Sequence, residues 1–96
     1  MGIEELLREK REEILQIAAR HGARNVRVFG SVARGEADER SDIDLLIDLG
    51  PTRTPWFPGG LIVDLENLLG RDVDIATTAA LRPRIRERVL REAVPL

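Results

Sequence analysis

The fold is decided by a short stretch in the middle of the chain, SDIDLLIDL at positions 41–49. Apolar and acidic residues alternate along it, and successive side chains of a strand point to opposite faces. One face would carry Ile43, Leu45, Ile47 and Leu49, and the other Asp42, Asp44, Leu46 and Asp48. The stretch therefore predicts a strand over residues 43–49, with one face in a core and the other face acidic.

Two further strands and three helices are predicted around this strand. The strands span residues 25–29 and 72–76, and the helices span residues 3–21, residues 61–69 and a last segment that Thr78 caps and that holds Pro83 in its first turn. The signals are apolar residues at helical or alternating spacing and glycines at helix ends. Residues 31–41, which can hold a short helix, and the proline-rich residues 50–60 are expected loops. Helices must cover the apolar face of such a sheet, so we expect an α+β fold in two layers.

Length and composition limit the possible functions. The 96 residues contain no repeat and no internal boundary, so they form one domain, residues 1–96. Fifteen Lys and Arg against 17 Asp and Glu give a net charge of -2, which argues against direct nucleic-acid binding over a basic surface. The absence of cysteine excludes disulfides, thiolate metal sites and a cysteine nucleophile. Because no signal peptide and no membrane span is recognisable, we expect a cytoplasmic location without membrane association.

Three aspartates are candidates for a catalytic metal site. Asp42 and Asp44 would share one strand face, about 7 Å apart, and Asp74 alternates with apolar neighbours in the strand over residues 72–76. If these strands are neighbours, the three carboxylates converge and repel one another unless cations neutralise them. Carboxylate oxygens suit Mg²⁺, and two such ions can activate a hydroxyl and stabilise a leaving phosphate. Aspartates at strand ends are also often merely solvated, and we assign Asp48 and Asp72 to surface or structural roles.

Four further residues are candidates for binding a nucleotide. Gly30 and Ser31 follow the strand over residues 25–29, and exposed amides with a hydroxyl can cradle phosphate oxygens. Arg34 could pair with a phosphate or with a neighbouring acid. Ser41 could hydrogen-bond the Asp42 carboxylate or cap the turn. A Gly-Ser pair alone is more often an ordinary turn between a strand and a loop.

Together, these segments are much more specific than they are apart. GSVARG at positions 30–35, SDIDL at 41–45 and VDI at 73–75 resemble the nucleotidyltransferase superfamily related to DNA polymerase β, and within it the minimal nucleotidyltransferase (MNT) family. The signature is Gly-Ser, ten intervening residues and Asp-x-Asp, and the resemblance covers essentially the whole chain. It implies a polymerase-β-like fold, with a small mixed sheet covered by helices.

The resemblance also implies residue roles. Asp42 and Asp44 would hold the magnesium ions, two in number, that bind the triphosphate of ATP. Asp74 would complete one ion site and help to activate the acceptor hydroxyl. Gly30 and Ser31 would bind the β- and γ-phosphates, with Arg34 and Ser41 as further nucleotide-binding residues.

MNT proteins that resemble this chain are antitoxins encoded beside an HEPN-domain ribonuclease toxin. They transfer AMP from ATP to a tyrosine of the toxin, and the added negative charge would interfere with RNA binding. The resemblance therefore implies a Mg-ATP-dependent protein adenylyltransferase that acts as the antitoxin of an HEPN/MNT pair. Two alternatives stay open: a non-catalytic antitoxin that binds its toxin stoichiometrically, and a nucleotidyltransferase for a small molecule such as an aminoglycoside.

Residues 51–60 depart from the family pattern, because they are rich in proline and contain Trp56 and Phe57. Trp56 could stack on a base or contact a partner, but we expect it to pack at the edge of the sheet. The apolar faces of the terminal helices are large for so small a core, so we also expect a homodimer or a hetero-oligomer with the HEPN partner.

Overall fold

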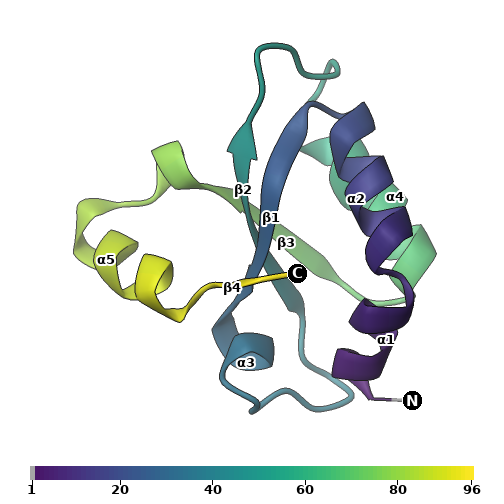
Figure 1. The fold of residues 1–96 in the computed structure, drawn as a ribbon, viewed down its shortest axis with the longest axis vertical. Helices are drawn as coiled ribbons and strands as arrows, with labels where there is room; N and C mark the ends of the chain where they lie inside the picture. Colours follow the sequence, from purple (N-terminus) through teal and green to yellow (C-terminus); the bar gives the residue numbers. More distant parts are fainter. Residues whose placement is uncertain (1) are drawn as a thin grey trace.

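The computed structural model describes residues 2–96, which form a four-stranded mixed sheet in the order β3-β2-β1-β4 (Figure 1). The strands are β1 (Ala23–Phe29), β2 (Ile43–Leu49), β3 (Val73–Thr77) and β4 (Val94–Pro95). β2 runs antiparallel to β1 and parallel to β3, and β4 adds to the other edge of β1 in antiparallel orientation. The predicted α+β class is confirmed.

The helices lie on two sides of this sheet. On one side are α1 (Ile3–Glu9), α2 (Arg11–Arg20) and α4 (Gly59–Leu69) (Figure 1). The short helix α3 (Gly30–Ala33) follows β1 directly. On the other side are the 3-10 turn η1 (Thr78–Ala80) and helix α5 (Pro83–Glu92), which stands away from the sheet (Figure 1). Among residues 2–96, no helix combines the length and the apolar character needed to cross a membrane.

The predicted alternation along β2 is confirmed by burial. Ile43, Leu45 and Ile47 are at most 1 % exposed and pack with residues of α2 and α4. Asp44 and Asp48 lie on the opposite face and are partly exposed. Leu46, on that same face, is nevertheless completely buried, because η1 packs over β2. The sheet therefore has one apolar face under three helices and one acidic face that α5 and η1 cover only in part.

Two expectations about the helices are wrong. The helix predicted over residues 3–21 is divided at Lys10, which ends α1 and precedes α2. No glycine or proline marks this break, where Lys10 has a φ of -96° and a ψ of 7°. Thr78 does not cap the last helix: the Thr77 hydroxyl accepts from the Ala80 amide at the start of η1, and α5 begins only at Pro83.

Two features elsewhere also differ from expectation. Strand β4 was not predicted, because two residues are too few for a pattern of alternation. Trp56 does not pack at the sheet edge but is 92 % exposed. The neighbouring Phe57 packs against the core instead, so the 51–60 loop is anchored by the second aromatic residue and presents the first one to solvent.

Candidate active site

The sheet brings two of the three candidate aspartates into register. In the parallel pair of β2 and β3, Asp44 lies directly beside Asp74. Asp42 precedes Asp44 by two residues, immediately before β2 begins. Asp42 and Asp74 are exposed, whereas Asp44 is partly buried. The condition on which the sequence argument depended, that these strands are neighbours, is therefore met.

Asp44 lies in the electrostatic field of the two other candidate aspartates. The pKa of Asp44 is raised above its ordinary value, first by burial and then by the negative charges of Asp74 and Asp42. The positive charge of Arg34 opposes this shift only in part. An excess of negative charge of this kind is what a bound cation would neutralise.

Gly30 lies directly against the Asp44 carboxylate. It begins the turn from β1 into α3 with a φ of +72°, a conformation that glycine adopts without steric penalty. A Cβ atom at this position would overlap the Asp44 carboxylate oxygen. The Gly-Ser turn and the Asp-x-Asp strand thus form a single site, and glycine is required there for two independent reasons.

Arg34 is held by two acids. Its Nη1 donates to Glu92 Oε1 at 2.8 Å, and its Nε donates to Glu36 Oε2 at 3.0 Å. The other oxygen of Glu92, Oε2, accepts the Gly30 amide hydrogen at 3.0 Å. Arg34 and the Gly30 amide together lower the pKa of Glu92. Of the two roles open to Arg34 from the sequence, the structure shows the pairing with neighbouring acids.

Glu92 is the site residue that the sequence analysis missed. It stands 62 positions from Gly30 in the chain, and only the return of α5 toward α3 brings the two together. An acid at the end of a surface helix gives no signal of such a contact.

The two serines have different surroundings. Ser31 follows Gly30 in α3 and is partly buried. The Ser41 hydroxyl accepts from the Asp38 amide at 2.9 Å and contacts Asp38 Oδ1 at 3.2 Å. It therefore fixes the turn before β2 and does not bond the Asp42 carboxylate. A contact of either serine with a nucleotide stays a prediction.

Within residues 2–96, no three carboxylate or imidazole groups are gathered closely enough to form a ready-made metal site. The chemistry of the donors still fits a divalent cation, because Asp42, Asp44 and Asp74 supply only hard carboxylate oxygens.

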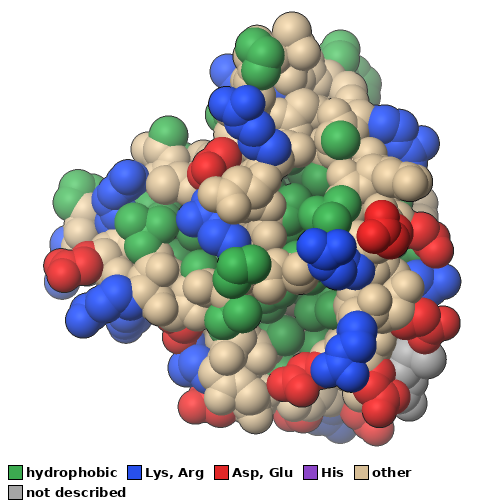
Figure 2. Space-filling view, in the orientation of Figure 1, with side chains coloured by type: hydrophobic (Ala, Val, Ile, Leu, Met, Phe, Trp, Pro, Cys, Tyr) green, Lys and Arg blue, Asp and Glu red, His purple; other side chains and the backbone are tan. Residues whose placement is uncertain are grey.

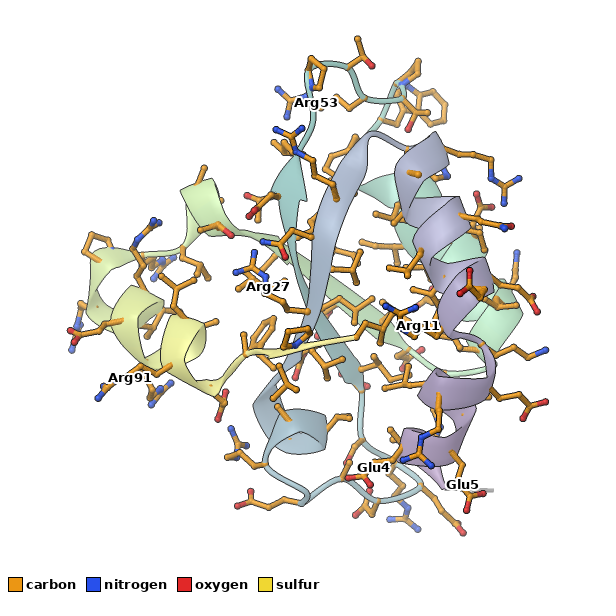
Figure 3. The ribbon with its side chains drawn as sticks, viewed as in Figure 1. Glu4, Glu5, Arg11, Arg27, Arg53 and Arg91 are labelled. Carbon is orange, nitrogen blue, oxygen red and sulfur yellow. The ribbon has the colours of Figure 1, made fainter. Side chains whose placement is uncertain are left out.

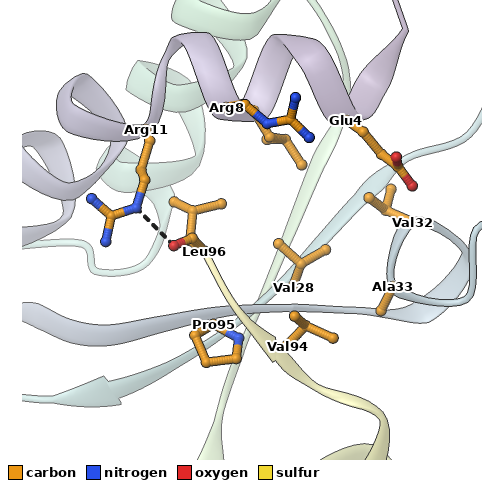
Figure 4. Close-up of a pocket in the computed structure, with 10 residues that line it drawn as sticks. Glu4, Arg8, Arg11, Val28, Val32, Ala33, Val94, Pro95 and Leu96 are labelled. Carbon is orange, nitrogen blue, oxygen red and sulfur yellow. Dashed lines mark hydrogen bonds between the residues drawn. The ribbon is translucent and has the colours of Figure 1, made fainter.

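A separate groove of about 320 Å³ lies between the N-terminal helices and β4 (Figure 4). Arg8, Val28, Val32 and Pro95 are among its lining residues, and Arg11 Nε closes one end with a hydrogen bond of 2.8 Å to the Leu96 carbonyl oxygen. None of the three candidate aspartates lines it. The groove is therefore distinct from the acidic site.

A mixed sheet that sets a Gly-Ser turn against paired strand carboxylates is the arrangement expected of a polymerase-β-like nucleotidyltransferase. Comparison with known proteins agrees with this class. A family model described as "Nucleotidyltransferase domain" matches residues 7–96. "Protein adenylyltransferase MntA" of Thermococcus cleftensis is 39% identical over 92 residues, which cover 96% of this chain and 90% of that protein.

Two solved structures share the fold. One, described as a "putative minimal nucleotidyltransferase", is 55% identical in sequence with a TM-score of 0.86, and the match covers 100% of this chain and 97% of that one. The other, a crystal structure of a toxin-antitoxin with AMP-PNP, is 20% identical with a TM-score of 0.74, over 88% of this chain and 69% of that one. The chain belongs to the nucleotidyltransferase domain family, and the resemblance to minimal nucleotidyltransferases is confirmed. Members of this family typically use a nucleotide and a divalent metal ion.

Proposed function

We propose that this nucleotidyltransferase is a Mg-ATP-dependent protein adenylyltransferase and acts as an antitoxin, transferring AMP to a tyrosine of an HEPN-domain ribonuclease toxin. The observation that carries the proposal is the register of Asp44 beside Asp74, with the Gly30 turn packed against Asp44. This arrangement provides carboxylates for a metal–triphosphate complex and a backbone amide for its phosphates at one edge of the sheet.

The proposed step exchanges a phosphoanhydride bond of ATP for a phosphate ester bond to tyrosine. The tyrosine oxygen forms a bond to the α-phosphorus of ATP, and the bond from that phosphorus to the oxygen bridging toward the β-phosphate breaks. Pyrophosphate leaves, and the tyrosine proton passes to the carboxylate of Asp74 and then to water. Magnesium, when bound, would stabilise the charge on the phosphates and favour loss of the hydroxyl proton.

The residues of the chain have distinct parts in this step. Asp42 and Asp44 would hold the two ions against the triphosphate, and Asp74 would complete one ion site and orient the acceptor hydroxyl. Gly30 and Ser31 would bind the β- and γ-phosphates. Arg34, whose charge already acts on Asp44, would neutralise part of the phosphate charge. Ser41 would keep the loop before Asp42 in place through its contacts with Asp38.

The nature of the acceptor is inferred from the exposure of the site and from the relatives. Asp42 and Asp74 are open to solvent, so a side chain on another protein can reach them. The Thermococcus relative is named as a protein adenylyltransferase, and the toxin–antitoxin structure was solved with AMP-PNP. Both support a protein acceptor and an adenosine nucleotide.

Exposed apolar side chains provide surface for such a complex. Trp56 on the 51–60 loop, Val94 in β4, and Ile85 and Leu90 on α5 are between 37 and 92 % exposed. Ile85 and Leu90 share α5 and Val94 follows it in β4, whereas Trp56 is on a separate loop. Exposed apolar residues that are grouped are typical of protein interfaces. We expect the chain to form a hetero-oligomer with its toxin, or a homodimer in the toxin's absence.

The experiment is incubation of the chain with α-labelled ATP, Mg²⁺ and the HEPN protein encoded beside it. The proposal requires label on the HEPN protein, at tyrosine, and its loss in an Asp42→Asn/Asp44→Asn double variant. Restored ribonuclease activity after that substitution would connect the transfer to the antitoxin role. A chelator should abolish labelling in the same way.

Two other results would each overturn the proposal in a specific direction. If the double variant inhibits the ribonuclease at a one-to-one ratio and no label is ever transferred, the chain is a stoichiometric binding antitoxin. If label appears only on an added aminoglycoside, the chain is a small-molecule nucleotidyltransferase.

A further inference from the structure

Glu92 binds the groups that the proposed function assigns to phosphate oxygens. Its two carboxylate oxygens accept from the Gly30 amide and from Arg34, at 3.0 and 2.8 Å. A carboxylate that bridges a backbone amide and a guanidinium reproduces the contacts of two phosphate oxygens. Building on the proposed function, we propose that Glu92 is an internal competitor of the nucleotide: a phosphate of ATP displaces its carboxylate from the Gly30 amide, which loosens the last turn of α5.

The competition follows from the number of donors. Arg34 has five N–H groups, so it can bind Glu92, Glu36 and a phosphate at once. The Gly30 amide has a single hydrogen, which Glu92 Oε2 already accepts. A phosphate oxygen can take this hydrogen only if Glu92 leaves. The exchange therefore takes place at Gly30, not at Arg34.

Electrostatic repulsion works in the same direction. Glu92 is ionised at neutral pH, since Arg34 and the Gly30 amide lower its pKa. A triphosphate on the same two donors would place several further negative charges within contact distance of this carboxylate. Like charges in so small a space are strongly unfavourable, and the less firmly held group should move.

Helix α5, which carries Glu92, has few contacts with the rest of the protein. Of residues 83–92, Val89 is the one that is buried, and the helix stands away from the sheet (Figure 1). Its arginine and hydrophobic side chains lie on the surface (Figure 2), and Arg91 projects into solvent (Figure 3). Apart from Val89, α5 is held by the bonds from Glu92 and by one from Arg86 to the Thr78 carbonyl oxygen. Just beyond its end, β4 is paired with β1. Displacement of Glu92 thus removes the side-chain bonds of the last turn of α5, while Val89 and the pairing of β4 with β1 remain.

The alternative is that Glu92 is a positioning residue, which orients Arg34 and the Gly30 turn and stays in place when the nucleotide binds. The two roles predict opposite changes in affinity when Glu92 is replaced. A competitor weakens nucleotide binding, so its removal strengthens it; a positioning residue supports binding, so its removal weakens it.

The test is calorimetric titration of Mg–AMP-PNP into the wild-type chain, Glu92→Ala and the isosteric Glu92→Gln, each first checked for folding by circular dichroism. Glu36→Gln is one matched control, because Glu36 also pairs with Arg34 but does not touch Gly30. Glu87→Gln is the second, because it removes the same charge from an exposed position of α5. We expect the dissociation constant to fall about tenfold in Glu92→Ala, less in Glu92→Gln, and to change less than about twofold in both controls.

A second measurement follows the helix itself. Saturating Mg–AMP-PNP should accelerate amide hydrogen exchange in residues 83–92 of the wild-type chain, and Glu92→Ala should show that faster exchange before any nucleotide is added. Equal or weaker binding by both Glu92 variants, with wild-type binding intact, would overturn the inference and leave the proposed function standing. If the wild-type chain binds no Mg–AMP-PNP at all, both fail.

Discussion

Asp44 and Asp48 stand four residues apart on the same face of β2, yet their surroundings are opposite. Asp48 accepts hydrogen bonds from Asn25, Arg27 and Thr78 at 2.6 to 2.9 Å, and its pKa is lowered, first by Asn25 and Thr78. Asp44 is partly buried beside Asp74, and its pKa is raised. Arg27 lies on the side of β1 that faces α5 (Figure 3). There it donates a hydrogen bond to Asp48 and none to Asp44.

The opposite pKa shifts distinguish Asp48, which stabilises the fold, from Asp44, whose charge a bound cation would neutralise. Donors that satisfy a carboxylate stabilise the fold, as around Asp48. A carboxylate that the protein surrounds with other carboxylates destabilises the fold, and such an arrangement is typical of functional sites. The same type of residue on the same strand face thus has opposite effects on stability, and substitution of each acid by asparagine can test this.

The largest expected effect is on catalysis by Asp44→Asn. Loss of one carboxylate from the metal–triphosphate site should reduce AMP transfer about a thousandfold or more, since such contacts contribute several kcal/mol to the transition state. The stability of the fold should stay equal or rise slightly, because a charge repelled by Asp74 and Asp42 is removed. Initial rates of label transfer and urea unfolding of the same preparation measure the two effects.

Asp72→Asn is the matched control for this substitution. Asp72 is exposed and lies just before β3, two positions from Asp74, and it was assigned a surface role from sequence. It should keep both activity and stability. Undiminished transfer by Asp44→Asn would remove Asp44 from the site, and an equal loss in Asp72→Asn would mean that general surface charge, not a specific ligand set, supports the reaction.

A smaller effect is expected at Gly30, which joins the turn to Asp44. Gly30→Ala places a Cβ against the Asp44 carboxylate at a positive φ, and should cost about 2–4 kcal/mol of stability and at least tenfold in transfer rate. Gly35 has nearly the same φ, +73°, but a Cβ atom added there would meet no other atom within 4 Å, so Gly35→Ala is the matched control. Gly35→Ala should lower the free energy of unfolding only by the cost of a positive φ in an L-residue, about 1–2 kcal/mol. It should leave AMP transfer unchanged. Equal costs in chemical unfolding would show that the contact with Asp44 is unimportant.

Local patterns were sufficient to predict the fold class and the placement of the acids. The period of two along residues 43–49 separated Asp44 and Asp48 from the buried Ile43, Leu45 and Ile47. It could not distinguish Asp44 from Asp48, because the distinction comes from Arg27 and Thr78, which other segments bring to Asp48. The assignment of Asp48 to a structural role was correct, but its partners were unknown.

The features that sequence could not predict all depend on distant parts of the chain. Glu92 reaches Gly30 only because α5 returns toward α3. The Thr78 hydroxyl donates a hydrogen bond to Asp48 and does not cap a helix, because η1 packs over β2. The break at Lys10 carries no glycine or proline signal, so local propensity gives no reason to expect it.

Asp48→Asn should have a modest effect on stability alone. The side chain of Asp48 is 38% exposed, so water and salt screen the pair with Arg27, and we expect a loss of about 0.5–1 kcal/mol in urea unfolding. Transfer activity should not change, since Asp48 is bound to structural partners and not to the Gly30 turn. A loss of activity at full stability would place Asp48 in the site and contradict the division of the two acids.

The smallest effect, and the one that compares the two acids most directly, is the pH dependence of stability in metal-free buffer. The lowered pKa of Asp48 means that its stabilisation is fully present above the ordinary carboxyl range and is lost as pH falls toward the lowered value. The raised pKa of Asp44 means that its unfavourable charge is fully present above that pKa and is relieved as pH falls through it to the ordinary range. On acidification, the wild-type chain should therefore lose its advantage over Asp48→Asn and gain relative to Asp44→Asn, each by under about 1 kcal/mol. Unfolding free energies of the three proteins between about pH 7 and pH 3 measure these slopes, and slopes of the same sign would mean that both acids contribute to stability in the same way.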